Sequence, residues 1–229
     1  MTTTRGLMCL GLLAVCPIAQ GSIAFSFADP GPGHQLTNTA NGGGTGIGRL
    51  TYNSTQAISL IVDGTTESAG MLTFNNARLE MTNMNLGAAQ TVGGVTTAPV
   101  TGGFTFFDFT GNVRTNILTA TIPTGSFVRI GNTNALLFSS SQGLVYSPGP
   151  ALTTFLAGAT FANPQEAVFT LTDVVVGGSL PLIGAGGVFN SFTANSSYSG
   201  NTATVPAPGS IVLLVLGAGV VAGRRRVRN

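Results

Sequence analysis

The chain has 229 residues, of which 33 are glycine and 7% are charged, against roughly 25% charged residues in an ordinary soluble domain. It contains no lysine and a single histidine, so a phosphate-binding P-loop, a Schiff-base enzyme, a Ser-Lys hydrolase and a multi-histidine metal site are excluded. The net charge of +2 comes from the arginines near the two chain ends, because the stretch between Phe25 and Val205 has four arginines and seven acids and a net charge of −3. The composition therefore gives no support for nucleic-acid binding, which needs a clustered basic face.

The N-terminal segment has the pattern of a secretory signal peptide. A short positive region precedes an apolar run over Gly6–Ala19, and two triplets then fit a small-x-small cleavage rule, Ala19-Gln20-Gly21 and Ser22-Ile23-Ala24. We therefore expect residues 1–24 to form a signal helix that is removed on export. Both cysteines lie inside the run, so the processed protein would have neither a disulfide nor a thiol nucleophile. A lipid-modified cysteine is the alternative, but neither cysteine follows a small residue.

Residues 25–204 are predicted to form an all-β extracellular body. Short β-branched or aromatic runs alternate with Gly, Pro, Asn and Asp, which is typical of antiparallel strands. Met71–Phe74, followed by Ala77, Leu79 and Met81, alternates apolar with polar residues as a half-buried strand does. Met81–Leu86 stays undecided, and no long amphipathic helix is predicted in the body. The clearest other strands are Phe104–Phe109, Ile117–Ile122, Phe127–Ile130, Ala167–Thr172 and Phe189–Thr193.

The body is long enough for one hydrophobic core. A chain of about 180 residues buries roughly 70% of its unfolded surface, so we expect a single antiparallel β-sandwich or jelly-roll-like domain. No internal repeat supports a solenoid or a propeller. Turn signals recur at Asp63-Gly64, Gly111-Asn112 and Gly131-Asn132. Three glycine-rich stretches with few charges are expected to be loops, namely Pro30–Gly48, Gly87–Gly103 and Gly177–Gly187.

Candidate chemistry in the body is sparse. The glycines of Asn41–Gly48 do not fit the dinucleotide-binding spacing, and His34 lies in a turn-rich stretch that favours a solvated side chain. Seven scattered acids always allow some pair to meet, so a carboxylate pair is weak evidence for a glycosidase, and we predict that the protein is not an enzyme. No cofactor is expected, and structural calcium stays open as an alternative. The acids that a sheet could bring together are Glu80, Asp108, Glu166 and Asp173.

Carbohydrate binding is the alternative function that we carry forward. The chain has no tryptophan, and its amphipathic rings are Tyr52, Tyr146 and Tyr198. A secreted carbohydrate-binding module would be expected to lose retention on a polysaccharide column when one of these tyrosines is changed. Asn53-Ser-Thr and Asn195-Ser-Ser match the glycosylation sequon, at a frequency near chance for a chain so rich in Asn, Ser and Thr.

The C-terminal segment, residues 205–229, has three parts in a fixed order. The first is Val205-Pro206-Ala207-Pro208, whose prolines prevent a helix from starting before Gly209. The second is the apolar run Gly209–Gly223, which as a helix reaches about 22 Å against the ~30 Å of a bilayer core, so we expect a weak transmembrane helix. The third is the cluster Arg224, Arg225 and Arg226, which stops the run and should stay cytoplasmic, leaving the body outside the inner membrane.

These three parts, at the C-terminus of a secreted chain, resemble the PEP-CTERM sorting-signal proteins of Gram-negative bacteria. The resemblance covers about Val205–Asn229, and Ala207 stands where the family has a central Glu. It implies processing near Val205–Pro208 by an exosortase, a membrane-embedded cysteine peptidase, and association with exopolysaccharide or biofilm matrix. We therefore expect a structural or adhesive protein that is held briefly in the inner membrane and then reaches the cell surface or the extracellular matrix. A plain tail anchor is the alternative.

Overall fold

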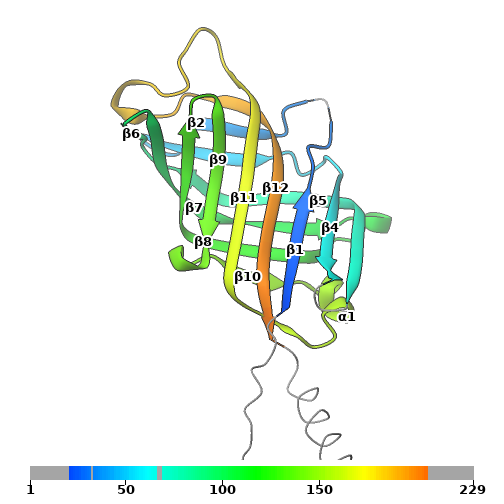
Figure 1. Cartoon of the computed structure of the whole chain (residues 1–229). Helices are drawn as coiled ribbons and strands as arrows, with labels where there is room; N and C mark the ends of the chain where they lie inside the picture. Colours follow the sequence, from blue (N-terminus) through cyan, green and yellow to red (C-terminus); the bar gives the residue numbers. More distant parts are fainter. Residues whose placement is uncertain (1–20, 32, 66–68, 206–229) are drawn as a thin grey trace, which may run out of the picture.

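The structure is a computed structural model of the whole chain, and it describes residues 21–31, 33–65 and 69–205 (Figure 1). Most of the expected signal helix and all of the expected transmembrane helix lie outside these residues. Within the described part of the chain, no helix is long and apolar enough to cross a membrane. The helical elements there are short: α1 (Thr153–Leu156) is a single turn, and the others are 3₁₀ turns.

Twelve strands make up most of the described chain, and all of their pairings are antiparallel, which confirms the expected all-β body. The strands are β1 (Gly21–Phe27), β2 (Leu36–Gly44), β3 (Ile47–Tyr52), β4 (Ile58–Gly64), β5 (Gly70–Leu86), β6 (Gln90–Val92), β7 (Val95–Asp108), β8 (Thr115–Ile130), β9 (Thr133–Ser139), β10 (Val145–Pro148), β11 (Thr160–Val176) and β12 (Phe192–Val205).

The strand pairings close into a circuit, which we call the closed sheet. In order, the circuit is β1, β4, β5, β7, β8, β9, β11 and β12, and β12 pairs back with β1. The β2–β3 hairpin bridges β12 and β5 beside the β1–β4 pair, since Phe192–Ala194 pair with β2 whereas Tyr198–Thr204 pair with β1. Closure leaves few unpaired strand edges.

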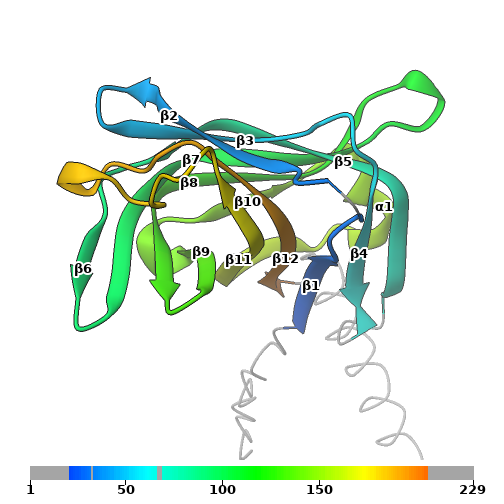
Figure 2. The same cartoon turned by 90° about the horizontal axis from the view of Figure 1, so that it is seen from above.

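Figures 1 and 2 show the two layers that this circuit forms: β9, β11, β12 and β1 lie side by side in one layer and cross β7 and β8 in the other. The expected sandwich or jelly roll is therefore replaced by one continuous sheet folded over a single core. The physical reason is that the long strands bend instead of ending. At the bend of β7, Gly102 has φ +131°, and a Cβ there would collide with the backbone of Asn83 and Met84 in β5. This close approach lets two paired strands turn the corner together.

The core is one cluster of inward-facing apolar side chains with an aromatic centre. Phe104 in β7 packs edge-to-face on Phe169 in β11 at 5.2 Å between ring centroids, and Phe169 lies 4.9 Å from Tyr198 in β12. Rings from both layers therefore meet in the middle, and such pairs add about 0.5–1.5 kcal/mol each beyond the area that they bury. The core fixes how the two layers cross.

Two of the three expected loops are wrong. Pro30–Gly48 contains β2 and the start of β3, and Gly87–Gly103 contains β6 and half of β7. The cause is pairing: much of each stretch pairs with a neighbouring strand, for example Val95–Val100 with Gly125–Ile130 of β8, and the weak hydrophobic pattern of these stretches does not show this. Gly177–Gly187 does connect strands as expected. Ile117–Ile122 and Phe127–Ile130 belong to the single strand β8.

Candidate functional site

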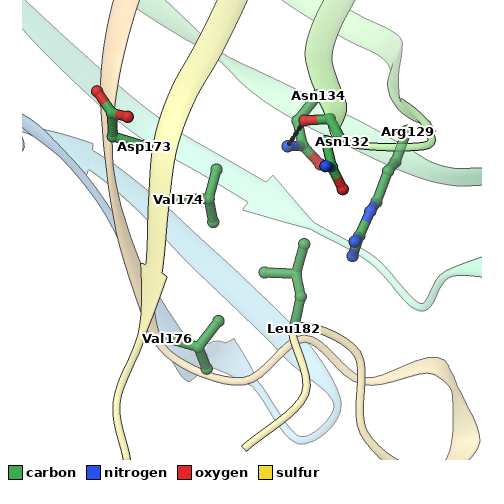
Figure 3. A pocket seen from close by; sticks show the side chains of 7 residues that line it. All are labelled: Arg129, Asn132, Asn134, Asp173, Val174, Val176 and Leu182. Carbon is green, nitrogen blue, oxygen red and sulfur yellow. Dashed lines mark hydrogen bonds between the residues drawn. The ribbon is translucent and has the colours of Figure 1, made fainter.

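The candidate site is a cavity of about 400 Å³ at one open end of the closed sheet (Figure 3). It lies between the tip of the β8–β9 hairpin, the end of β11 and the connection from β11 to β12. The opposite end of the sheet holds the first and last strand residues, since Gly21 pairs with Thr204 and Val205 pairs with the first residue of β11. The elements that line the cavity are thus at the opposite end of the body from Gly21 and Val205; Figure 1 shows the β11–β12 connection at one end and the start of β1 with the end of β12 at the other. The lining residues are Arg129, Asn132, Asn134, Asp173, Val174, Val176 and Leu182.

Strand alternation places two polar side chains on the inner face at this end. Along β9, Asn134 is on the same face as the buried Leu136 and Phe138, and Asn134 is itself only 6% exposed. Arg129 of β8 pairs directly with Asn134, and directly opposed residues in antiparallel strands share a face. The apolar inner face therefore changes to a polar one where the cavity begins.

A β-bulge supplies the acidic side of the cavity. The register between β11 and β12 shifts between Thr172 and Val175, and Asp173 within the shift has φ +49°. The extra residue redirects the strand locally. The Asp173 carboxylate accepts a hydrogen bond from the amide of Asn195 at 3.0 Å. Beyond the bulge, Val174 and Val176 are half-buried and form the apolar wall of the cavity.

The polar groups of the cavity have spare hydrogen-bonding capacity. Arg129 donates from Nε to the carbonyl of Gly131 at 3.0 Å, and within the described chain its guanidinium has no ion-pair partner. Asn134 donates from Nδ2 to the carbonyl of Asn132 at 3.1 Å, but its buried Oδ1 accepts no hydrogen bond. A buried acceptor without a donor costs about 1–3 kcal/mol, so it needs an explanation.

The four predicted acids each bond to a different partner and do not form a metal-binding group. Glu80 forms an ion pair with Arg114 at 2.6 Å, while Glu166, Asp108 and Asp173 each bond to a neutral side chain nearby. Among residues 21–31, 33–65 and 69–205, no group of three or more His, Cys, Asp or Glu side chains could hold a metal ion. None of the hydrogen bonds above joins two carboxylates.

The three tyrosines considered for saccharide stacking are buried, so that role is wrong for them. Tyr52, Tyr146 and Tyr198 are 7%, 3% and 2% exposed. The Tyr146 and Tyr198 hydroxyls lie 2.7 Å apart, and the Tyr146 hydroxyl donates to the carbonyl of Glu166 at 2.8 Å. Burial raises the pKa of all three well above the usual value of 10. They hold the core and present no ring to solvent.

The remaining sequence candidates lie away from the cavity. His34 is exposed, and Asn41–Gly48 forms the β2–β3 hairpin in place of the expected flexible loop. Of the predicted sorting residues, Val205 is the last residue of β12 and is half-buried. The rest of the sorting and membrane-stop set lies outside the described residues, namely Pro206, Ala207, Pro208, Arg224, Arg225 and Arg226.

Sequence reasoning did not single out Arg129 and Asn134. A signal was present: in Phe127-Val128-Arg129 and in Asn134-Ala135-Leu136, a polar residue takes the position that alternation assigns to the core face. A second depression, lined mainly by threonines and glycines over β5, β7 and β8, has no charged side chain. No protein-family model, curated protein or solved structure matches this chain. The site therefore stands on its geometry.

Proposed function

We propose that the protein is exported by its N-terminal signal, is held briefly in the inner membrane by its C-terminal segment, and is released or transferred by an exosortase-like peptidase to the cell surface or the extracellular polysaccharide matrix. There the body has a structural or adhesive role and no enzymatic one. The sorting motif in this proposal is Val205-Pro206-Ala207-Pro208, followed by the apolar run and the arginine cluster. The resemblance of this C-terminal pattern to the PEP-CTERM signal motivates the proposal.

The observation that carries it is the position of the body's two ends. β1 and β12 are neighbours over their whole shared length, from Gly21↔Thr204 to Phe27↔Tyr198. Gly21 and Val205, the first and last residues that the structure describes, therefore lie at the same end of the closed sheet (Figure 1). A cut after Val205 would remove the C-terminal segment without breaking a strand pair. This supports two removable termini around a self-contained body.

The extent of β1 also distinguishes the two expected signal cleavage sites. Ile23 is 2% exposed in the core, and Gly21–Ala24 all pair with β12. Cleavage after Ala24 would remove the core side chain of Ile23 and half of β1, whereas cleavage after Gly21 removes only the first residue of the strand and keeps Ile23. We therefore place the signal cleavage at Ala19-Gln20-Gly21 in this proposal, three residues before the boundary expected from sequence.

Mass spectrometry of the mature protein from its native host tests both ends. The expected N-terminus is Ser22, and the expected C-terminus lies between Pro206 and Ser210. Surface protein that retains the sequence through Arg224–Asn229 would contradict the sorting proposal. A matched variant, Pro206→Ala with Pro208→Ala, should keep the apolar run and the arginines but accumulate unprocessed in the membrane fraction.

A carbohydrate-binding module is the second candidate, and the cavity is the observation that favours it. Charged, amide and apolar side chains converge there, which is typical of sites for small polar ligands. The original test by tyrosine substitution no longer applies, because those rings are buried. The corresponding residues to change are Arg129 and Asn134.

A further inference from the structure

We propose that the open end of the closed sheet binds a uronic-acid unit, that is, an acidic sugar carrying one carboxylate and several hydroxyls. This inference deepens the second candidate function by naming a ligand class and a site. It requires neither the signal peptide nor the sorting motif. Its success or failure is therefore separate from that of the export proposal.

The carboxylate of the sugar is matched by Arg129. Its Nε is already held by the Gly131 carbonyl, which fixes the plane of the guanidinium at the hairpin tip. Its two terminal nitrogens donate no hydrogen bond to any residue within 21–31, 33–65 or 69–205. A guanidinium offers parallel N–H donors at the spacing of a carboxylate, so an anchored Arg with a free fork is suited to this group.

A hydroxyl of the sugar is matched by one buried acceptor, the Oδ1 of Asn134, which lacks a donor. The Asp173 carboxylate also belongs to the lining, but in Figure 3 it points away from Arg129, and it accepts a hydrogen bond from Asn195. A ligand hydroxyl that reaches Asn134 after a small side-chain rotation would remove the cost of its unpaired oxygen. Neither acceptor suits a second anion, which restricts the ligand to one that also donates.

The carbon face of the sugar ring is matched by an aliphatic wall. Val174 and Val176 project from β11 and Leu182 from the following connection, opposite Arg129, Asn132 and Asn134 in Figure 3. Leu180, two residues before Leu182 in the same connection, is 59% exposed and provides an apolar rim. Further sugar units of a longer chain could pack their C–H faces on this rim. The volume of about 400 Å³ falls in the range usual for small-molecule sites.

The test is titration calorimetry on the full chain, in a detergent without a sugar headgroup, with four probes: galacturonic acid, tetragalacturonate, glucose and acetate. Galacturonate should bind, tetragalacturonate should bind more tightly, and glucose and acetate should bind at least tenfold more weakly. Equal binding of acetate would reduce the site to a simple anion site. Equal binding of glucose would remove the role of Arg129. Either result would overturn the proposal, as would the absence of any galacturonate binding.

Two variants and a matched control assign the binding to the cavity. Arg129→Gln should weaken galacturonate about 10- to 100-fold, the usual effect of losing hydrogen bonds to a charged group. Arg114→Gln makes the same charge change at the far end of β8 and should change the affinity less than twofold. Equal losses in both variants would contradict the site.

Asn134→Leu separates a binding role from a structural one. Leucine has nearly the shape of asparagine, and at position 134 it would pack beside Leu136 on the inner face. The substitution also removes the unpaired Oδ1 of Asn134. The variant should therefore unfold at the same or a higher temperature while losing at least fivefold in galacturonate affinity. Lower thermal stability with unchanged affinity would show that Asn134 serves the fold and would contradict its place in the site.

Discussion

The protein should unfold cooperatively at alkaline pH, through its three tyrosines. The chain has no lysine and no tyrosine other than Tyr52, Tyr146 and Tyr198, so between about pH 9.5 and 12 these phenols are its titrating side chains. Burial, first of all, raises the pKa of each, and the pKa of Tyr198 is raised further by its hydrogen bond to Tyr146. The folded protein must therefore hold three protons that the unfolded chain releases.

The direction in which the free energy of unfolding changes with pH follows from the number of protons that each state binds. In the unfolded chain the phenols ionise near pH 10, whereas in the folded protein they stay protonated, so above pH 10 the unfolded state binds fewer protons and the free energy of unfolding falls as pH rises. Each phenol contributes about 1.4 kcal/mol per pH unit, so three together lower the stability by about 4 kcal/mol at pH 11 and about 8 kcal/mol at pH 12. The stabilisation is fully present below pH 10. A domain with a stability of about 5–8 kcal/mol, in the lower part of the ordinary range, would lose its fold by pH 12.

The assay is a pH titration from 8 to 12 that follows tyrosinate absorbance and far-ultraviolet circular dichroism together. The two signals should change at the same pH, with the steepness of a process that releases several protons, and no tryptophan interferes. Tyr198→Phe should release one proton fewer on unfolding, so its transition should be less steep. Its midpoint should also lie at a higher pH than that of a wild-type protein with the same stability at neutral pH. Gradual ionisation with a midpoint near pH 10 and an unchanged circular dichroism spectrum would refute the burial argument.

The remaining predictions concern packing. Gly200→Ala should lower the free energy of unfolding by about 1–3 kcal/mol, because the new methyl would collide with the Tyr146 and Tyr198 hydroxyls. The control is Gly177→Ala, since a Cβ at Gly177 meets nothing within 4 Å. This variant should change the free energy of unfolding by less than about 0.5 kcal/mol. Phe104→Ala should lower the free energy of unfolding in urea by about 3–5 kcal/mol, because the ring is 1% exposed and contacts several other aromatic rings. The control is Val92→Ala at an exposed site. A loss for Phe104→Ala no larger than that of the control would contradict the central place of the ring.

The all-β class was predictable because aromatic and β-branched runs mark the core strands directly. β5, β7, β8 and β11 each contain a run that the alternating pattern identifies. The closure of the sheet was not predictable, because it depends on bends at residues whose sequence gives no sign of them. Gly102 reads as one more loop glycine, yet its positive φ and its contact with the β5 backbone turn β7 from one layer into the other. The local hydrophobic pattern of a sequence indicates which residues are buried, but it does not indicate which strands pair with each other.

The cavity could be predicted only in part. Asp173 was a candidate as one of several acids, and Gly131-Asn132 was identified as a turn, which is the tip of the β8–β9 hairpin in the structure. What sequence could not supply is that this tip and the β11 bulge face each other across the open end, because Asp173 and Arg129 are brought near by pairings through β9. The buried tyrosines show the reverse error: an amphipathic ring is as useful inside a core as on a surface.

The neighbouring positions of β1 and β12 have a consequence for how the chain folds. In the export that we propose, β1 emerges first and β12, with which it pairs along its length, emerges last, so the circuit remains open until the C-terminal strand has left the translocation channel. Contacts between residues so distant in sequence carry a large loop-closure entropy, which makes folding slow. Until then the chain exposes the edges of β1 and β11 that β12 later covers, and these are sites for misassembly. A pause in the membrane directly after β12 would hold that last strand beside its partner while the ring forms.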